Sequence, residues 1–378
     1  MVYLLNLLSG LTIAEVAIKQ YEAGCEPPTS FKDFASTVIG ERVGSVISGL
    51  FVFINYCIVA FDTSRFGELL HDRVFPADPI LLTTLFACTV SGSVATLSSE
   101  KISKFAAYCT TALFVTFGAI LIPGLALMRS PIITMNIPQA STESTIAAFG
   151  AAAPVFLTAM VYQNIVPTVV KLLSYDRISS ILSITVGSTI PVFMYAAFIF
   201  ASLGGGLDVG NVDPNLVTVF ALTSLIGGCT AATLSLAGEF TSLMSEMKGT
   251  KVVDVCDLTT PNEQRSIFSE ETVDELGEDG GSGITSVTLA MAPPVIVGAL
   301  YSHGATFIDA LKWAGTYGSP MVYGLLPAAL ALVQRNEQRN NEEIKADNIL
   351  PGGDISLMGL GLASVSFAIL CSVSPHLS

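Results

Sequence analysis

The 378-residue sequence has few charged residues and none of the motifs that mark the common enzyme classes. Only 13% of its residues are Asp, Glu, Lys or Arg, and it has one tryptophan and three histidines. It contains no HExxH or GxxxxGK(S/T) motif and no Ser/His/Asp set. The sequence therefore indicates a protein that is not an enzyme and needs no cofactor, and its net charge of −14 gives no reason to expect a nucleic-acid partner.

The seven cysteines show no paired spacing. Most of them lie in apolar runs, where cysteine behaves as a small hydrophobic residue. We therefore expect neither a disulfide framework nor a metal site. The opening stretch, MVYLLNLLSGLTIAEVA, lacks a basic segment and a clear small-residue cleavage site, so a secretory signal peptide is the poorer interpretation of it.

Long apolar runs are what the sequence has in abundance. Hydrophobic residues make up 51% of the chain and the mean hydropathy is +0.64, a balance typical of polytopic membrane proteins. We therefore predict an all-α polytopic membrane protein with a single transmembrane domain over residues 1–378. The ten runs long enough to cross a bilayer are Val2–Ala17, Val43–Phe61, Pro79–Ala95, Phe105–Leu127, Ala147–Leu172, Ile178–Ser202, Leu216–Leu243, Ile284–Tyr301, Ile308–Val333 and Ile355–Val373.

The basic residues test this span count, because a wrong count would scramble their alternation between the two sides. With ten spans, 13 of the 17 Lys and Arg residues fall on one side, and Arg65, Arg73, Arg129 and Lys312 fall on the other. The rich side is predicted to be cytoplasmic, which puts both termini on the opposite side. The acidic segment 247–283 then lies in the cytoplasm, and its composition predicts a disordered loop.

A short helix is predicted in the first cytoplasmic loop, Ile18–Glu41, where Thr29 or Ser30 can cap its first turn. The side chains expected to face the membrane surface from this helix are those of Phe31, Phe34 and Ala35. A plain solvated linker is the alternative interpretation of the loop.

The stretch Ala147–Leu173 is the centre of our interpretation. It is long and apolar enough to cross a bilayer, yet Tyr162, Gln163 and Asn164 lie together in its middle. Pro167 follows, and its ring is expected to displace the carbonyl of Gln163 four residues earlier. Such a break is tolerated only where protein or water meets it, as at the midplane sites of secondary transporters. A proline-kinked span with polar side chains bonded to neighbouring helices explains the break alone equally well.

Several segments resemble, in order along nearly the whole chain, the spans of one known family. SGLTIAEVAI at Ser9–Ile18 resembles its second span, PVFLTAMVYQNIVPTVVKLL at Pro154–Leu173 its broken sixth span, and SLIGGCTAATLSLAGEF at Ser224–Phe240 its eighth. On these segments the chain resembles the tryptophan/tyrosine permeases, the aromatic amino acid branch of the amino acid–polyamine–organocation superfamily, and most of all its plant and algal members. The resemblance implies a five-plus-five inverted-repeat fold of the leucine-transporter type.

Two features depart from the family pattern. The family's first span, with its glycine-rich break, has no counterpart in this sequence, so we expect a member that lacks the usual first span. Many members also carry a histidine where this chain has Gln163, and the histidines of this chain lie outside the span cores, at His71, His303 and His376. A proton relay based on histidine is therefore not available to this chain.

By resemblance, an amino acid substrate would lie at mid-membrane between the broken sixth span and the third and eighth spans. The broken span would offer Tyr162, Gln163 and Asn164, with Pro167 holding the break open. For the two amides we favour substrate binding over a bond to a neighbouring helix, and for hydroxyl groups we favour a bond within their own helix. The residues that the third and eighth spans would add are Asn55, Tyr56, Thr230, Thr233 and Ser235.

Ionisable residues within the spans are scarce, so each is a candidate for function. Glu15 and Glu239 fall towards the cytoplasmic ends of their spans. A carboxylate there could carry a coupled proton, or could gate the pathway by pairing with Lys19 or Lys171. Functional and structural roles stay equally open for the two glutamates, whereas snorkelling to the interface is the favoured alternative for Lys171.

Together these features predict a secondary active transporter that moves aromatic or other neutral amino acids by alternating access, with a proton as the expected coupling ion. Its expected partners are the amino acid, the proton and the lipid bilayer. The membrane is expected to be the plasma membrane, or the plastid envelope if the source is an alga or plant. The alternatives are a truncated or sensor-like membrane protein without transport activity, and a channel.

Overall fold

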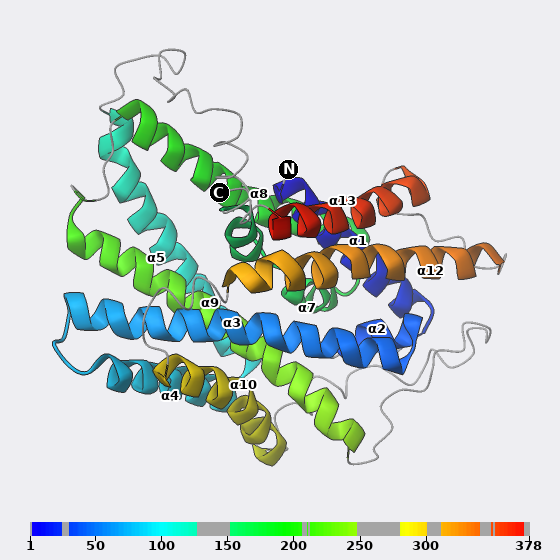
Figure 1. Cartoon of the computed structure of the whole chain (residues 1–378), viewed down its shortest axis with the longest axis horizontal. Helices are drawn as coiled ribbons and strands as arrows, with labels where there is room; N and C mark the ends of the chain where they lie inside the picture. Colours follow the sequence, from blue (N-terminus) through cyan, green and yellow to red (C-terminus); the bar gives the residue numbers. More distant parts are fainter. Residues whose placement is uncertain are drawn as a thin grey trace.

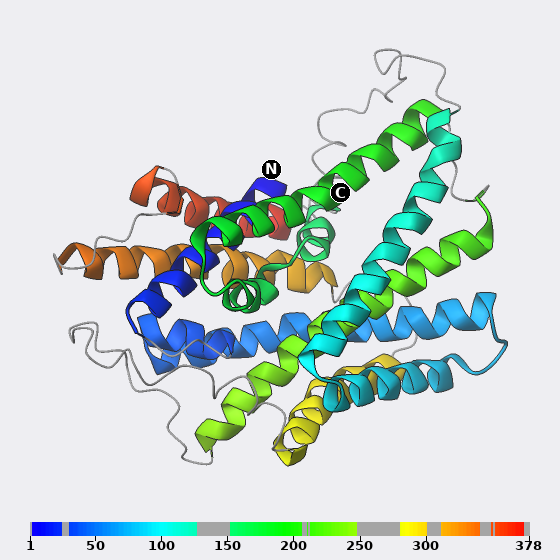
Figure 2. The same cartoon turned by 180° about the vertical axis from the view of Figure 1, so that it is seen from behind.

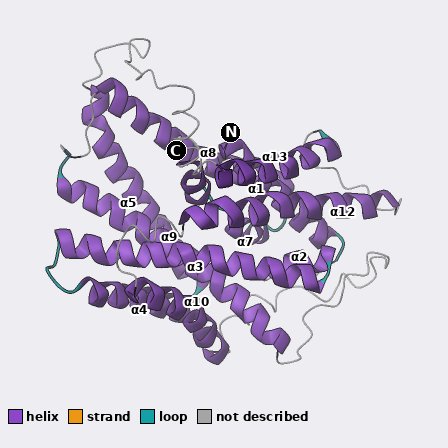
Figure 3. Ribbon diagram, viewed as in Figure 1, coloured by secondary structure: helices purple, strands orange, loops and turns teal. Residues whose placement is uncertain are grey.

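The computed structural model describes residues 2–24, 30–126, 152–205, 210, 212–247, 280–300, 311–340, 349–350 and 352–373. Helices form all the regular structure in these ranges, and no strand occurs within them (Figure 3). The chain is therefore all-α, as its composition predicts. Most of the predicted acidic loop, residues 248–279, lies outside the described residues.

All ten predicted spans correspond to helices. Among the described residues, nine helices are long and apolar enough to cross a membrane, and the tenth predicted span contains the shorter apolar helix Gly283–Ala299. The unbroken spans are α1 (Val2–Glu22), α3 (Glu41–Arg73), α4 (Pro79–Thr96), α5 (Ser99–Ala126), α8 (Arg177–Gly205), α9 (Pro214–Met247), α10 (Gly280–Leu300) and α13 (Gly353–Val373). The remaining spans, Ala152–Leu172 and Leu311–Asn336, are irregular.

The span that starts at Leu311 contains two π-helical turns, η4 (Ala314–Gly318) and η5 (Met321–Leu325), before it continues as α12 (Leu326–Asn340). The hydrogen bonds of such turns span one residue more than those of an α-helix, and the turns frequently occur at functional sites. Ser319 and Pro320 lie between the two turns.

The second half of the chain repeats the order of helix lengths of the first half. The long helix α3, of 33 residues, is followed by the short α4, and the long α9, of 34 residues, is followed by the short α10. α9 crosses and packs against α3, and α4 and α10 lie side by side next to this crossing (Figures 1 and 2). This repetition agrees with the predicted inverted-repeat arrangement.

The short helix predicted in the loop Ile18–Glu41 is confirmed as α2 (Phe31–Ile39), and Ser30 caps it by accepting a hydrogen bond from the Asp33 N–H at 3.0 Å. Its predicted position at the membrane surface is wrong. Phe31, Phe34 and Ala35 are buried in the largest apolar core, which α1, α3, η5 and α12 also build. The Phe31 ring stacks on the ring of Phe51 in α3 at a centroid distance of 4.8 Å. α2 is therefore a part of the protein core and not an interfacial helix.

Two spans approach each other closely at Gly315, and we expect its replacement by alanine to destabilise the protein. A Cβ atom at Gly315 would overlap with the Pro154 carbonyl oxygen and lie 2.6 Å from the Thr158 Oγ1. Because a backbone oxygen cannot turn aside, Gly315→Ala should cost about 1–3 kcal/mol. In α5, a Cβ at Gly118 has nothing within 4 Å, so Gly118→Ala should not destabilise. Equal thermal midpoints of the two variants in detergent would contradict the close approach.

Candidate functional site

The helix of the central span is broken, as predicted, and the break lies before Pro167. Residues 152–159 are helical, the chain leaves the helix at 160–162, and a 3₁₀ turn, η2 (Gln163–Ile165), leads into α7 (Val166–Leu172). Pro167 lies in the first turn of α7, where a missing N–H costs nothing. The Gln163 carbonyl, expected to be displaced, instead accepts a hydrogen bond from the Val166 N–H. Pro167 therefore starts the second half-helix and does not itself interrupt a continuous one.

The side chain of Gln163 is fully buried and joins the break to α1. Its Nε2 donates to the Oδ1 of Asn6 at 2.6 Å, and its Oε1 accepts from the Tyr162 backbone N–H at 2.9 Å. The Tyr162 hydroxyl donates to the Asn6 carbonyl at 3.1 Å. The Tyr162 ring lies against Gly10, where a Cβ would come within 2.8 Å of the ring. The absence of a side chain at Gly10 thus allows this close contact.

Asn164 extends from the other side of the break towards α9. Its Nδ2 donates to the Ser235 hydroxyl at 3.4 Å, and that hydroxyl donates to the Ala231 carbonyl of its own helix at 3.0 Å. The three predicted residues Tyr162, Gln163 and Asn164 therefore lie between α1 and α9. Their amide and hydroxyl groups are donors and acceptors of the kind that can bind the charged ends of an amino acid.

A small cavity lies beside the broken span, with room for about one water molecule. α1, the helix of residues 152–159, the 319–324 segment and α13 contribute its lining. Three of the lining residues each have a buried polar atom without a hydrogen-bond partner among the described residues: Asn6 (Nδ2), Ser319 (Oγ) and Tyr323 (the hydroxyl). Buried polar atoms without a partner are rare in proteins, so the cavity is suited to a polar occupant.

The other predicted binding residues lie apart from the break. The Asn55 amide donates to the Phe51 carbonyl at 2.9 Å, and its Oδ1 has no hydrogen-bond partner among the described residues. The Tyr56 hydroxyl donates to the Leu289 carbonyl of α10 at 2.7 Å. Asn55 therefore bonds within its own helix, whereas Tyr56 contacts α10.

The two predicted threonines of α9 bond within their own helix. Thr230 donates to the Ile226 carbonyl and Thr233 to the Cys229 carbonyl, each at 2.7 Å. The Thr233 hydroxyl also lies 3.2 Å from the sulfur of Met291 in α10. This is the pattern that we favoured for hydroxyl groups inside a span.

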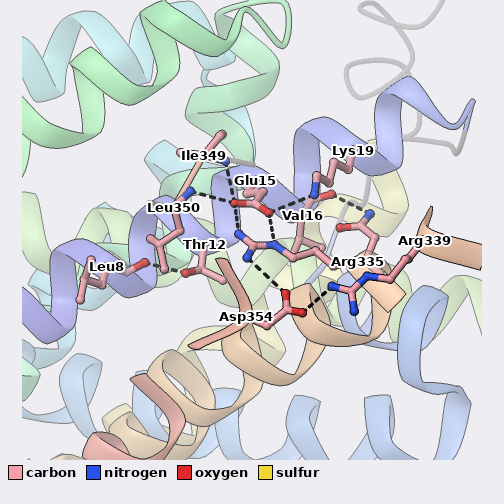
Figure 4. A network of polar contacts seen from close by, with 11 residues as sticks. Leu8, Thr12, Glu15, Val16, Lys19, Arg335, Arg339, Ile349, Leu350 and Asp354 are labelled. Carbon is pink, nitrogen blue, oxygen red and sulfur yellow. Dashed lines mark hydrogen bonds and ion pairs between the residues drawn. The ribbon is translucent and has the colours of Figure 1, made fainter. Parts of the chain in front are cut away.

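Glu15 lies at the centre of a buried ionic network (Figure 4). Its carboxylate is 1% exposed and accepts from Lys19 Nζ at 3.0 Å and from Arg335 Nε and Nη2 at 2.8 and 2.9 Å. The backbone N–H groups of Ile349 and Leu350 also donate to it, at 2.9 and 3.1 Å. Such two-point binding by arginine is among the strongest carboxylate contacts in proteins. Glu15 thus joins α1 to α12 and to the segment before α13.

The network continues from Arg335 to α13. Arg335 Nη1 forms an ion pair with Asp354 Oδ1 at 3.6 Å, and Arg339 Nη2 contacts Asp354 Oδ2 at 2.7 Å (Figure 4). Lys19, predicted as a partner of Glu15, takes part in this network. The other predicted partner, Lys171, lies exposed in the last turn of α7.

Glu239 is buried, with 1% of its surface exposed, and binds the N-terminus of α2. Its Oε2 accepts from the Phe31 N–H at 2.8 Å and its Oε1 accepts from the Lys32 N–H at 3.2 Å. The first N–H groups of a helix have no partner within the helix and attract negative charge. Glu239 therefore fixes α2 to α9.

Sequence reasoning missed several residues of these sites. Asn6 lies inside an apolar run and Tyr323 lies in a stretch without charge, so only their polar character could have drawn attention to them. Arg335 lies two residues after the apolar run that ends at Val333, and we counted it only as one of the basic residues on the side predicted to be cytoplasmic. Its position one turn before Arg339 at a span end is the signal that could have identified it as a partner of a buried carboxylate.

Comparison with known proteins assigns the family. The sequence profile of the tryptophan/tyrosine permease family matches residues 1–251, which include every described helix from α1 to α9 and the broken span. A comparison with curated proteins finds no match. The match covers well over half of the chain and agrees with the nine long apolar helices of the described residues. The chain therefore belongs to the tryptophan/tyrosine permease family and is an integral, multi-pass membrane permease that transports amino acids.

Proposed function

We propose that this permease is a secondary active transporter that moves aromatic or other neutral amino acids together with protons. The observation that carries the proposal is the broken span, whose buried amide Gln163 lies between α1 and α9 in the middle of a helix otherwise suited to lipid. Broken helices with polar residues at the break are the usual means by which secondary transporters expose backbone and side-chain groups to a substrate.

In this proposal the break binds the amino acid. Gln163 and Asn164 offer both donors and acceptors to the ammonium and carboxylate groups of the substrate, and Tyr162 offers a ring face to an aromatic side chain. Pro167 fixes the start of the second half-helix beside the break. Residues from the neighbouring spans complete the site in the substrate-bound state: Asn55, Tyr56, Thr230 and Thr233.

Glu15 is proposed to act as a gate at the end of the pathway. Its ion pairs with Lys19 and Arg335 join α1 to α12, and alternating access requires such contacts to open and close. Glu239 is proposed to couple α2 to α9 through the α2 N-terminus. Lys171 stays a candidate at the end of α7, where its exposed ammonium can contact either the lipid head groups or the gate.

The test is uptake of radiolabelled L-tryptophan by the purified protein in proteoliposomes, with the lumen more alkaline than the medium. We expect saturable uptake that exceeds equilibration, that unlabelled L-tyrosine reduces and that a protonophore abolishes. Uptake without saturation would indicate a channel. Absence of uptake for tryptophan, tyrosine and other neutral amino acids would leave a sensor-like protein as the better assignment.

A further inference from the structure

Asp62 is a buried carboxylate that the sites described above do not use. It lies on α3, and only 8% of the residue is exposed. It contacts α9 at Gly228, where a Cβ atom would lie 2.8 Å from the Asp62 Oδ2. Any side chain at this position would press on the carboxylate, so the glycine leaves the space that the Asp62 carboxyl group occupies.

Asp62 has no partner for its charge among the described residues, since it takes part in no hydrogen bond and no ion pair there. On its own helix the nearest basic residue is Arg65, which is about half exposed and pairs with Glu68 at 2.7 Å. From α9 the titratable group that faces Asp62 is the thiol of Cys229. Burying an ionised carboxylate without a partner costs far more free energy than burying a protonated one.

The other helices packed against α3 supply no charge to Asp62 either. α10 carries no titratable residue in its sequence, and Glu239 and Glu246 of α9 lie eleven or more residues beyond Gly228. The remaining titratable groups on elements that contact α3 are Lys32 and Asp33 on α2, Cys88 on α4, and Tyr317 and Tyr323 on η4 and η5. No ion pair or hydrogen bond joins any of these described groups to Asp62.

The position of Asp62 relates it to the broken span. Gly228 lies near the middle of α9, seven residues before Ser235, which is about 10 Å along a helix axis. Ser235 is the residue that Asn164 of the break contacts. On α3, Asp62 follows Asn55 by seven residues, which places both on the same face of the helix. Asp62 therefore lies about two turns from the proposed substrate site, along both helices.

We propose that Asp62 is the proton-binding residue of this transporter. Its carboxylate takes up one proton from the side of the membrane on which α3 ends, and the neutral acid packs against Gly228. The proton leaves to the opposite side after the transporter has changed to the conformation that is open there. The ionised form needs a donor, and no described residue supplies one in this arrangement of α3 and α9, so the protonation state favours one arrangement of these two helices. The inference rests on the proposed function, because a coupled proton requires a transported substrate.

The test compares Asp62→Asn, which imitates the protonated acid, with the wild-type protein in proteoliposomes. We expect the variant to lose accumulation of radiolabelled L-tryptophan driven by the pH gradient and to keep exchange of labelled for unlabelled L-tryptophan, since exchange needs no net movement of protons. Glu68→Gln, an acidic residue of the same helix with an exposed partner, is the matched control and should accumulate tryptophan normally. Accumulation by Asp62→Asn at the wild-type level would overturn the proposal.

A second readout does not depend on transport. Infrared difference spectra of the reconstituted protein at low and high pH should contain a carboxylic acid C=O band that is missing from Asp62→Asn and present in Glu68→Gln. If Asp62→Asn loses exchange as well, this band decides: its selective loss supports proton binding by Asp62, and identical spectra refute it. If the wild-type protein itself transports no amino acid, the proposed function fails, and the same band still decides whether Asp62 binds a proton.

Discussion

Replacing Glu15 with alanine is expected to destabilise the protein by about 3–5 kcal/mol, because the change removes the buried carboxylate that two buried positive charges bind. Lys19 and Arg335 are both nearly fully buried, with side chains 2% and 4% exposed, and both bind the carboxylate of Glu15. Without it, two positive charges would face each other out of contact with water, and the N–H groups of Ile349 and Leu350 would lose their acceptor. Denaturant unfolding in mixed micelles measures the loss, with the thermal midpoint as a second readout.

The exposed pair Arg65–Glu68 is the matched control for this experiment. Its side chains are 52% and 24% exposed, so Glu68→Ala should cost at most about 1 kcal/mol. A variant in which Glu15, Lys19 and Arg335 are all replaced by methionine should recover most of the loss, since a buried ion pair is often no more stable than well-packed apolar residues. A stability of Glu15→Ala equal to that of Glu68→Ala would show that water or another charge compensates the network.

The sequence predicts the spans well because a bilayer requires long apolar helices, but it predicts their ends less well. The predicted span Val43–Phe61 ends at the last residue before Asp62, whereas α3 continues to Arg73. A carboxylate is a good signal for the end of a span only when it reaches water. Here Gly228 of α9 makes room for Asp62 inside the packed protein, and no local pattern in α3 contains that information.

For the site, too, the sequence predicts contacts within one helix and misses contacts between distant helices. The cluster Tyr162–Asn164 and the Glu15–Lys19 pair are visible in the sequence, because their members are adjacent or four residues apart on one helix. The sequence does not identify the more distant partners. Asn6 lies 157 residues from Gln163, and Arg335 lies 320 residues from Glu15. The rotation of each span about its own axis determines these contacts, and it results from packing among all the spans.

Gln163→Ala is expected to reduce the initial rate of L-tryptophan uptake by about tenfold or more, because in the proposed site Gln163 binds a charged group of the substrate, and the loss of such a hydrogen bond costs about 1.5–3 kcal/mol. Gln163 is fully buried, and its Nε2 is the donor to Asn6 Oδ1 at 2.6 Å. Uptake in proteoliposomes, normalised to inserted protein, measures the effect. Gln334→Ala is the control: it removes a glutamine that is also buried, 4% exposed, and donates to the Val16 carbonyl at 3.4 Å. The control should keep wild-type uptake.

The variants Asn6→Ala and Gln163→Ala together separate the two interpretations of the break. If Gln163 serves only to bond the broken span to α1, then both single variants and the double variant should lose the same activity, because each removes the same hydrogen bond. If Gln163 binds the substrate, as we propose, Gln163→Ala should raise the KM for tryptophan beyond the KM of Asn6→Ala.

Asn164→Ala should raise the KM for tryptophan in the same way, because Asn164 is proposed to bind the substrate. Its contact within the protein is only a long bond of 3.4 Å to Ser235, so the loss of that bond should have little effect by itself. Normal uptake in both Gln163→Ala and Asn164→Ala would remove these two amides from the substrate site, because the substrate would then bind without them.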